Sequence, residues 1–133
     1  MPYQIVYDRT NRIIRARFEG RVTDDELMDV YRLGQKLVGQ LDPQAGITDF
    51  SDVTTVAFTP ETIYELAAAK PIMRDPGRLV IFVAPTPHVY GMARMFEILG
   101  EGTRPNLHVV RSLDEAYKLL NVQGPQFEPV GIK

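Results

Sequence analysis

An alternating strand runs directly into a capped helix in residues 12–26, RIIRARFEGRVTDDE. Apolar and charged side chains alternate in the strand, so one face is expected to be buried and the other exposed to solvent. The apolar members are Ile14, Ala16 and Phe18, and the charged members are Arg15, Arg17 and Glu19. Thr23 and Glu26 then match a capping box, which satisfies backbone N–H groups at a helix start. A helix is therefore predicted to begin immediately after the strand.

Apolar residues recur at spacings of three and four in the segment after Thr23, until Asp42-Pro43 ends the pattern. They are Leu27, Val30, Tyr31, Gly34, Leu37, Val38 and Leu41. This spacing predicts the longest helix of the chain. Upstream, residues 3–8 (YQIVYD) are extended in character and are joined to the strand by Arg9-Thr10-Asn11, so the two strands are expected to form a β-hairpin.

The middle of the chain contains two further strands and a helix. Residues 45–50 are predicted to form a short buried strand, and a polar stretch follows it. Thr59-Pro60-Glu61 is typical of a helix start, and this second helix should extend to about Lys70. Residues 79–83 (LVIFV) are apolar without alternation, which indicates a central strand covered on both faces.

Cap residues mark the last two helices. Thr86-Pro87 is expected to open a third helix that runs to Leu99, and Ser112 to cap a short fourth helix after a strand at residues 106–111. The expected inner side of the third helix comprises Val89, Met92, Ala93, Met95, Phe96 and Leu99.

The order β-β-α-β-α-β-α-β-α predicts an α/β fold with a mixed, mostly parallel five-stranded sheet and about four helices. A chain of 133 residues is long enough to bury a hydrophobic core without disulfides or a structural metal. We expect one domain over residues 1–122. Residues 123–133 contain two prolines and two glycines and are expected to form a loose or partner-dependent C-terminal tail.

Composition argues against several classes of partner. Fifteen Lys and Arg against seventeen Asp and Glu give a net charge of -2, so nucleic acid is not an expected partner. The absence of cysteine excludes a disulfide framework, a thiolate nucleophile and a cysteine-based zinc site. The chain start lacks the pattern of a signal peptide, and the apolar run Leu79–Ala84 is too short for stable membrane insertion. These features predict a cytoplasmic protein.

Three stretches carry a resemblance to a known family: residues 18–23 (FEGRVT), 48–53 (TDFSDV) and 91–97 (GMARMFE). They resemble the STAS domain family, named for sulphate transporters and anti-sigma-factor antagonists, and in particular its SpoIIAA-like branch of small stand-alone bacterial proteins. The resemblance extends from about Val6 to Leu120. It implies a SpoIIAA-like fold and a non-enzymatic interaction or regulatory module, and proteins of that branch mostly lack an assigned biochemical activity.

Antagonists of the wider family carry a serine that a partner kinase phosphorylates. When that pattern is laid on this chain, Phe58 occupies the phosphoacceptor position, Ala57 the acidic position and Pro60 lies near the glycine. The usual phosphoacceptor is therefore missing. Thr59 is the adjacent hydroxyl, but its place before a proline favours an N-cap role over phosphorylation.

Ligands of open α/β sheets bind at the carboxyl ends of the parallel strands, near helix N-termini. The polar residues expected there are Ser51, Asp52, Thr54, Thr59, Thr86, His88, Tyr90 and Ser112. Thr59, Thr86 and Ser112 also fit plain capping roles. The predicted ligand- or partner-binding residues are Ser51, Asp52, Thr54, Thr59, His88, Tyr90 and Arg94.

Catalytic and metal patterns are weak. Ser51 and His88 with Asp49 or Asp52 could be written as a triad, but no Gly-x-Ser-x-Gly motif occurs. His88 and His108 lack metal-ligand spacing. Gly100-Glu101-Gly102 follows a helix instead of opening one, so it does not match a phosphate loop. We therefore predict no catalytic residues, metal or cofactor.

Two functions remain open. The first is a non-enzymatic interaction module, expected to be a homodimer, with a rim formed by Ser51–Thr59 and His88–Arg94. The alternative is a small-molecule or lipid carrier whose apolar pocket lies between the sheet and the second and third helices, lined by residues such as Met92. Arg94 fits either a pair with Glu97 or an anion site with His88 and Tyr90.

Overall fold

Six strands form one sheet in the computed structural model, which describes residues 3–130. The strands are β1 (Tyr3–Asp8), β2 (Ile13–Thr23), β3 (Ala45–Ala57), β4 (Val80–Val83), β5 (Leu107–Val110) and β6 (Glu128–Pro129). Their order across the sheet is β5-β4-β3-β2-β1-β6. Strands β2 to β5 pair in parallel, and β1 is antiparallel to both neighbours. The predicted mixed sheet is confirmed, with six strands in place of five.

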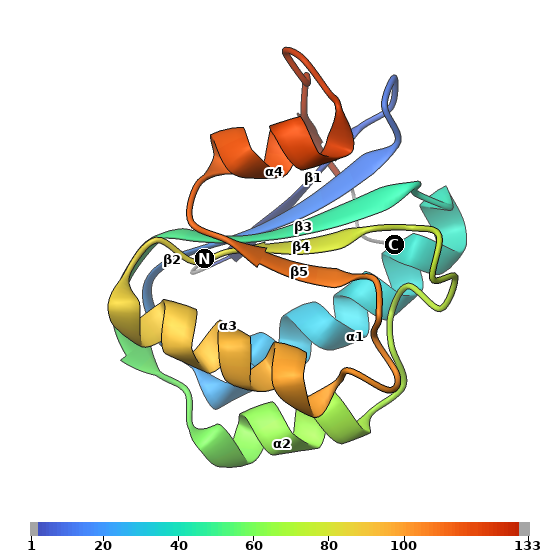
Figure 1. Cartoon of the computed structure of the whole chain (residues 1–133). Helices are drawn as coiled ribbons and strands as arrows, with labels where there is room; N and C mark the ends of the chain where they lie inside the picture. The colour runs from blue at the N-terminus through green and yellow to red at the C-terminus, as the bar shows by residue number, and fades with distance from the viewer. Residues whose placement is uncertain (1–2, 131–133) are drawn as a thin grey trace.

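Four helices cover the sheet on two sides (Figure 1). They are α1 (Asp24–Leu41), α2 (Pro60–Ala68), α3 (Pro87–Leu99) and α4 (Leu113–Leu120). Helices α1, α2 and α3 lie on one face, and α4 lies on the other. The predicted α/β order is therefore confirmed, and its crossover helices are divided between both faces of the sheet.

Helix α1 begins and ends where the sequence predicts. The Thr23 side chain accepts a hydrogen bond from the Glu26 N–H, and the Glu26 carboxylate accepts one from the Thr23 N–H at 2.8 Å. This reciprocal pair is the predicted capping box. At the other end Asp42 adopts a left-handed conformation with φ 50°, and Pro43 prevents a further turn.

Strand β3 is longer than predicted, because it continues past Phe50 to Ala57. Its second half pairs with the second half of β2, which itself continues through Gly20 to Thr23. Gly20 has a φ of +69°, a conformation that suits glycine, and the register shifts on either side of it. The polar second half of β3 therefore forms a strand because β2 provides backbone hydrogen-bond partners beside it.

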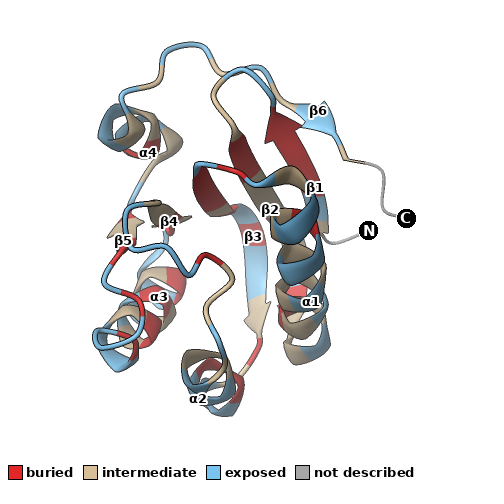
Figure 2. Cartoon of the chain, turned by 90° about the vertical axis from the view of Figure 1, so that its right-hand side faces the viewer, coloured by how far each residue is buried: buried red, intermediate tan, exposed pale blue. Residues whose placement is uncertain are grey.

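The sheet separates two apolar layers. On the side of α1–α3, the rings of Phe18 and Phe50 stack at 5.3 Å, and those of Phe82 and Phe96 stack at 5.4 Å. On the opposite side, Ile81 and Val83 of β4 are fully buried in a cluster with residues of α4. Strand β4 thus lies centrally, as predicted, and Figure 2 shows the buried residues gathered along the sheet and the inward helix faces. Leu99, predicted on the inner side of α3, is instead 41% exposed.

The C-terminal segment returns to the hairpin. Strand β6 pairs with β1, with Glu128 opposite Tyr7 and Pro129 opposite Val6. Before it, the ring of Phe127 lies 4.3 Å from the Arg15 guanidinium carbon, in a cation–π contact. Residues 127–130 therefore pack on the sheet. The domain boundary at residue 122 stays a prediction, and residues 131–133 lie outside the described part of the chain.

Asp8 stabilises the turn of the hairpin. Its carboxylate is 1% exposed and accepts hydrogen bonds from the Thr10 N–H at 3.0 Å, the Asn11 N–H at 3.2 Å and the Asn11 side-chain amide at 2.7 Å. Burial acts to raise the pKa of Asp8, but these hydrogen bonds outweigh it and the pKa is lowered. The folded state therefore favours the ionised carboxylate.

We predict that Asp8→Asn lowers the free energy of unfolding by about 1–3 kcal/mol at pH 7, because an amide places a donor against the Asn11 donors. The lowered pKa means that this contribution is complete above about pH 4 and is lost as the pH falls below it. Denaturant unfolding between pH 3 and 7 should show the two proteins converging in acid. As a control, Glu101→Gln, in an exposed turn, should change the free energy of unfolding by less than about 0.5 kcal/mol. A difference in the free energy of unfolding between Asp8→Asn and the parent that stays constant at all pH values would contradict this role of Asp8.

Candidate functional site

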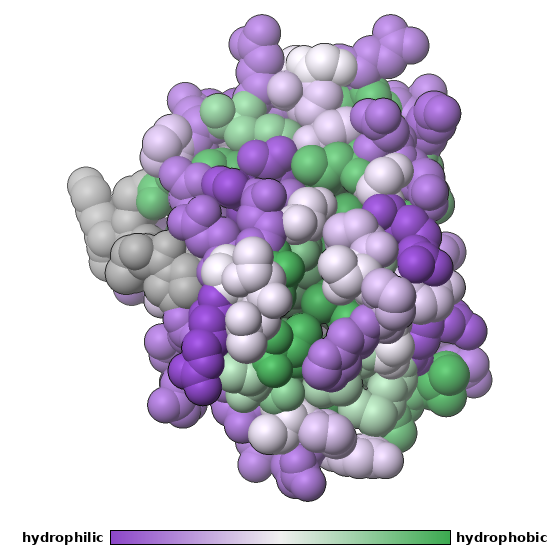
Figure 3. Space-filling model, turned by 90° about the vertical axis from the view of Figure 1, so that its left-hand side faces the viewer, coloured by the Kyte–Doolittle hydropathy of each residue, from purple (hydrophilic) through white to green (hydrophobic). Residues whose placement is uncertain are grey.

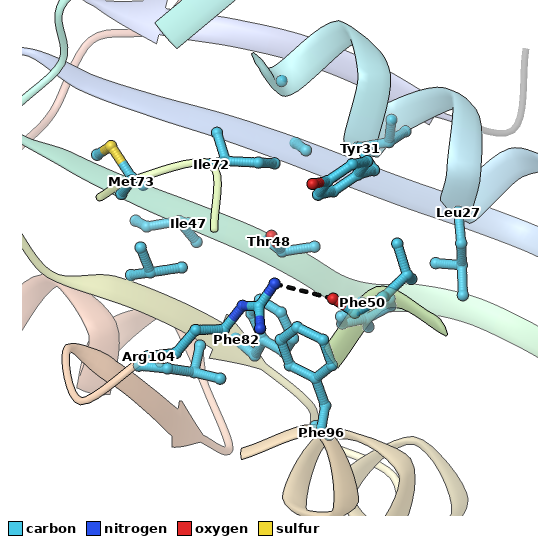
Figure 4. Close-up of a pocket in the computed structure, with 18 of the residues that line it drawn as sticks. Leu27, Tyr31, Ile47, Thr48, Phe50, Ile72, Met73, Phe82, Phe96 and Arg104 are labelled. Atoms are coloured by element: carbon cyan, nitrogen blue, oxygen red, sulfur yellow. Dashed lines mark hydrogen bonds between the residues drawn. The ribbon is translucent and has the colours of Figure 1, made fainter. Parts of the chain in front are cut away.

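An apolar cavity of about 180 Å³ lies between the sheet and helices α1, α2 and α3. Its floor is formed by alternate residues of three strands, because the pleat turns every second side chain to this face. The floor residues are Ile14, Ala16 and Phe18 of β2, Gly46, Thr48 and Phe50 of β3, and Val80 and Phe82 of β4. We call this space the apolar cavity (Figure 4).

The walls come from the apolar stripes of the three helices. Five of the seven residues predicted on the inner side of α1 line the cavity, namely Leu27, Val30, Tyr31, Gly34 and Val38. Helix α2 contributes Ile63 and Leu66, and α3 contributes Val89, Met92, Ala93 and Phe96. Figure 3 shows hydrophobic side chains in a hollow whose border includes side chains of intermediate and hydrophilic character.

Two features leave the cavity open. Small residues face it, and helices α1 and α2, which border it, do not pack closely on each other. Helix α2 packs against α3, whereas α1 packs on β2. Ala16, Gly34, Gly46 and Ala93 all line the space between them. Small side chains at these positions thus leave room between the sheet and the helices.

Residues 71–73, which we call the strap, close one end of the cavity. Pro71, Ile72 and Met73 line it after the end of α2. The Tyr31 hydroxyl donates a hydrogen bond to the carbonyl of Lys70, the residue before the strap. A Cβ atom on Gly34 would lie 2.9 Å from Ile72 Cδ1, so the glycine permits the strap to rest directly on α1.

Arg104 is the charged residue of the lining. It is 8% exposed, and its guanidinium donates to the carbonyls of Leu66 and Ala67 at 2.8 Å and of Ala69 at 2.9 Å. These carbonyls lie at the C-terminal end of α2, where the helix dipole favours a cation. The guanidinium carbon also lies 4.8 Å from the centre of the Phe96 ring. Burial lowers the pKa of Arg104, and Tyr31 acts against that shift.

The structure places the predicted residues of β3 outside the apolar cavity. Ser51, Asp52 and Thr54 are exposed on the second half of the strand. The Ser51 N–H and hydroxyl donate to Asp49 at 2.9 Å and 2.5 Å, and Asp52 accepts from Arg17 Nε at 2.6 Å. Ser51 therefore hydrogen-bonds to Asp49 and makes no hydrogen bond to His88 within residues 3–130.

Thr59 precedes α2, as predicted, but its side chain does not cap that helix. Its N–H donates to Asp24 Oδ1 at 2.7 Å, and its hydroxyl lies 3.2 Å from Asp24 Oδ2. Asp24 is the first residue of α1, so this contact joins the starts of two helices. The capping interpretation is correct for Ser112, which accepts from the Glu115 N–H, but Thr86 also lacks a side-chain cap.

The three predicted residues of α3 point to different neighbours. His88 and Arg94 are exposed, and Arg94 pairs with Glu97, one of the two roles the sequence left open. The Tyr90 ring lies 4.3 Å from the guanidinium carbon of Arg111. None of the seven predicted binding residues is in the cavity lining. Their role in binding stays a prediction.

Residues 3–130 do not meet the requirements of a metal-ligand cluster or of a membrane-spanning helix. Within residues 3–130 no three His, Asp or Glu side chains cluster so that they could hold a metal ion. Over the same residues, no helix has both the length and the apolar character needed to cross a bilayer.

Comparison with known proteins supports the fold. No family model and no curated protein sequence matches this chain. Among solved structures, the chain is similar to the phosphorylated form of SpoIIAA, the Bacillus cell fate determinant, with a TM-score of 0.52 and 14% sequence identity. The match covers 88% of this chain and 98% of that chain. At this identity the similarity concerns the fold, and the predicted SpoIIAA-like, STAS-like fold is confirmed.

We predict that Thr59→Val lowers the free energy of unfolding by about 1 kcal/mol, because it removes the hydroxyl that contacts Asp24. Thr54→Val is the matched control: Thr54 is exposed on β3, and its replacement should change stability by less than about 0.5 kcal/mol. Urea denaturation measures both variants. Equal effects of the two substitutions would mean that the Asp24–Thr59 contact does not stabilise the fold.

Proposed function

We propose that this protein is a non-enzymatic, STAS-like regulatory module that binds a small apolar molecule in the cavity between its sheet and helices α1–α3. The observation that carries the proposal is the cavity itself. Protein interiors are normally packed as densely as organic crystals, with few voids larger than a water molecule. A space of about 180 Å³ lined by phenylalanine, leucine, isoleucine and methionine is a departure from that rule.

The apolar lining of the cavity supports the proposal. The cavity is partly open, so its phenylalanine, leucine, isoleucine and methionine side chains face solvent when no ligand is bound. Removal of apolar surface from water is favourable by roughly 25 cal/mol per Å². A bound apolar molecule would cover this lining and gain that stabilisation.

Phosphorylation at the usual position of the fold is disfavoured by the side chains present. Phe58, which the sequence resemblance aligns with the phosphoacceptor, is 5% exposed and packs in the core. A phosphate on the neighbouring Thr59 would stand against the Asp24 carboxylate, and two anions would repel each other. We therefore propose that ligand binding replaces phosphorylation as the input of this module.

A second candidate function is binding of a protein partner or a second copy of the chain through the outer surface. Two observations favour it. Ser51, Asp52, Thr54, His88 and Arg94 are exposed and available for contact. Tyr64 and Ile98, on the adjacent helices α2 and α3, are both 56% exposed although they are large and hydrophobic. The two functions are compatible, because the cavity lies beneath these helices.

Ala16→Ile adds apolar volume to the cavity floor, and we predict that it raises the free energy of unfolding of the ligand-free protein by about 1 kcal/mol. The β-branched side chain also suits a strand. Thr54→Ile places the same side chain at an exposed position of β3, outside the cavity, and should give no comparable gain. Chemical denaturation of the delipidated proteins measures both effects. Destabilisation by Ala16→Ile would show that the space is too small to accept additional atoms.

Native mass spectrometry of the gently purified full chain tests the function itself. We expect a non-covalent adduct that disappears on denaturation and that is lost in Ala16→Ile but retained in Thr54→Ile. The same spectrum reports the oligomer mass and any covalent phosphate on Thr59. A clean mass for the parent protein, unchanged after incubation with either 3-phenylpropionate or 3-phenyl-1-propanol, would overturn the ligand-binding proposal and leave the surface interaction as the remaining candidate.

A further inference from the structure

The charge balance of the apolar cavity is uneven. Arg104 is the one charged residue in its lining, which contains no Asp, Glu, Lys or His. No carboxylate of residues 3–130 forms an ion pair with the Arg104 guanidinium. Buried charges are normally paired with an opposite charge, because removal from water is costly. The cavity is therefore bordered by a positive charge for which residues 3–130 supply no counter-charge.

Within residues 3–130, the hydrogen-bond acceptors of Arg104 are all neutral. Nη1 and Nη2 donate to the three carbonyls at the end of α2, and Nη1 also lies 3.5 Å from the Thr103 hydroxyl. The Nε–H group donates to no atom of residues 3–130. Carbonyl dipoles hold the guanidinium in place but leave its net charge uncancelled.

Thr48 adds a further polar group to the lining. It lies in the middle of the floor, between Ala16 of β2 and Phe82 of β4 in the sheet register. Its hydroxyl makes no hydrogen bond to another described residue. In the view of Figure 4 the Thr48 side chain lies between the ends of Tyr31 and Arg104. The Tyr31 hydroxyl and the Asn106 amide also line the cavity, but they donate to the carbonyls of Lys70 and Arg78. The Thr48 hydroxyl and the Arg104 Nε–H are thus donors without an acceptor in residues 3–130, on a mostly apolar surface.

We propose that the apolar cavity binds a small carboxylic acid in its ionised form, with the carboxylate paired to the Arg104 guanidinium and the apolar body packed against the phenylalanine side chains. This inference rests on the proposed ligand-binding function and specifies its ligand class. A carboxylate supplies the missing negative charge and accepts charge-assisted hydrogen bonds, which are stronger than those between neutral groups. Arginine is suited to carboxylates by its planar set of donors.

The size and lining of the cavity limit the body of the ligand. Engineered apolar cavities of about 150 Å³ bind benzene. A space of about 180 Å³ accommodates a ring with a short chain, and the edges and faces of Phe50, Phe82 and Phe96 offer the contacts that aromatic rings prefer. A phenyl ring two carbons from a carboxylate, as in 3-phenylpropionate, fits these limits.

Isothermal titration calorimetry at pH 7 with 3-phenylpropionate and 3-phenyl-1-propanol tests the inference on the full chain. The two probes share the ring and chain and differ in charge. We expect the carboxylate to bind the parent protein about tenfold to a hundredfold more tightly than the alcohol. Equal affinities, or tighter binding of the alcohol, would overturn the inference while leaving the proposed ligand-binding function intact.

Two substitutions at Arg104 identify the group responsible. Arg104→Met keeps an unbranched side chain without charge, so the carboxylate should lose its advantage while the alcohol binds within about threefold of its parent affinity. Arg104→Lys retains a positive charge and should keep part of the preference. Persistence of the full preference in Arg104→Met would overturn the role of Arg104. If neither probe binds the parent protein, both the inference and the proposed function fail.

Arg104 also holds the end of α2, so its substitution could unfold the protein. A measurement on the parent protein avoids this difficulty. In ¹H–¹⁵N spectra the Arg104 Nε–H resonance, assigned by its absence from any folded Arg104 variant or by side-chain correlation, should shift on addition of 3-phenylpropionate and stay in place with 3-phenyl-1-propanol. An unchanged Arg104 resonance when the carboxylate binds would contradict the proposed pairing.

Discussion

The parallel pairing of β2 with β3 is the constraint on which the rest of the molecule depends. Each strand runs into a helix at its carboxyl end, so pairing of the strands brings the starts of α1 and α2 together. The Asp24–Thr59 hydrogen bonds join the helices there, and the Tyr31–Lys70 hydrogen bond joins α1 to the residue that precedes the strap. Between these ties the helices do not pack closely, and the small residues that face the gap leave it open. The cavity is thus a product of the strand pairing.

Most elements were predictable because their signals are local. The alternation of β2, the capping box at Thr23 and the Thr-Pro starts of α2 and α3 each depend on neighbouring residues, and the helices begin at those positions. The second half of β3 was missed because its polar side chains adopt a strand only when β2 continues past Gly20. Strand β6 was missed because two paired residues provide no periodic pattern.

The cavity and the burial of Arg104 could not be predicted in full from the sequence. The inner residues of α1 and α3 were largely identified, but an apolar stripe has the same spacing whether it packs tightly or borders a hollow. Arg104 was missed because an arginine between Thr103 and Pro105 resembles an ordinary turn residue. Its burial results from the meeting of its loop with the end of α2, a contact across 35 to 38 positions of the chain. The rule that ligands bind at strand ends directed attention to the surface instead.

The Arg104 contacts have a consequence for the order of folding. The end of α2 and the strap follow the first half of the chain, yet the group that holds that end of α2 comes from the loop before β5. The β1–β2 hairpin, α1 and β3 can pair and pack before this loop arrives, but the end of α2 cannot be fastened without it. Contacts of such sequence separation form slowly, because the chain between them must first be ordered. The cavity should therefore take its final shape late in folding, after the sheet to which it belongs has extended as far as β5.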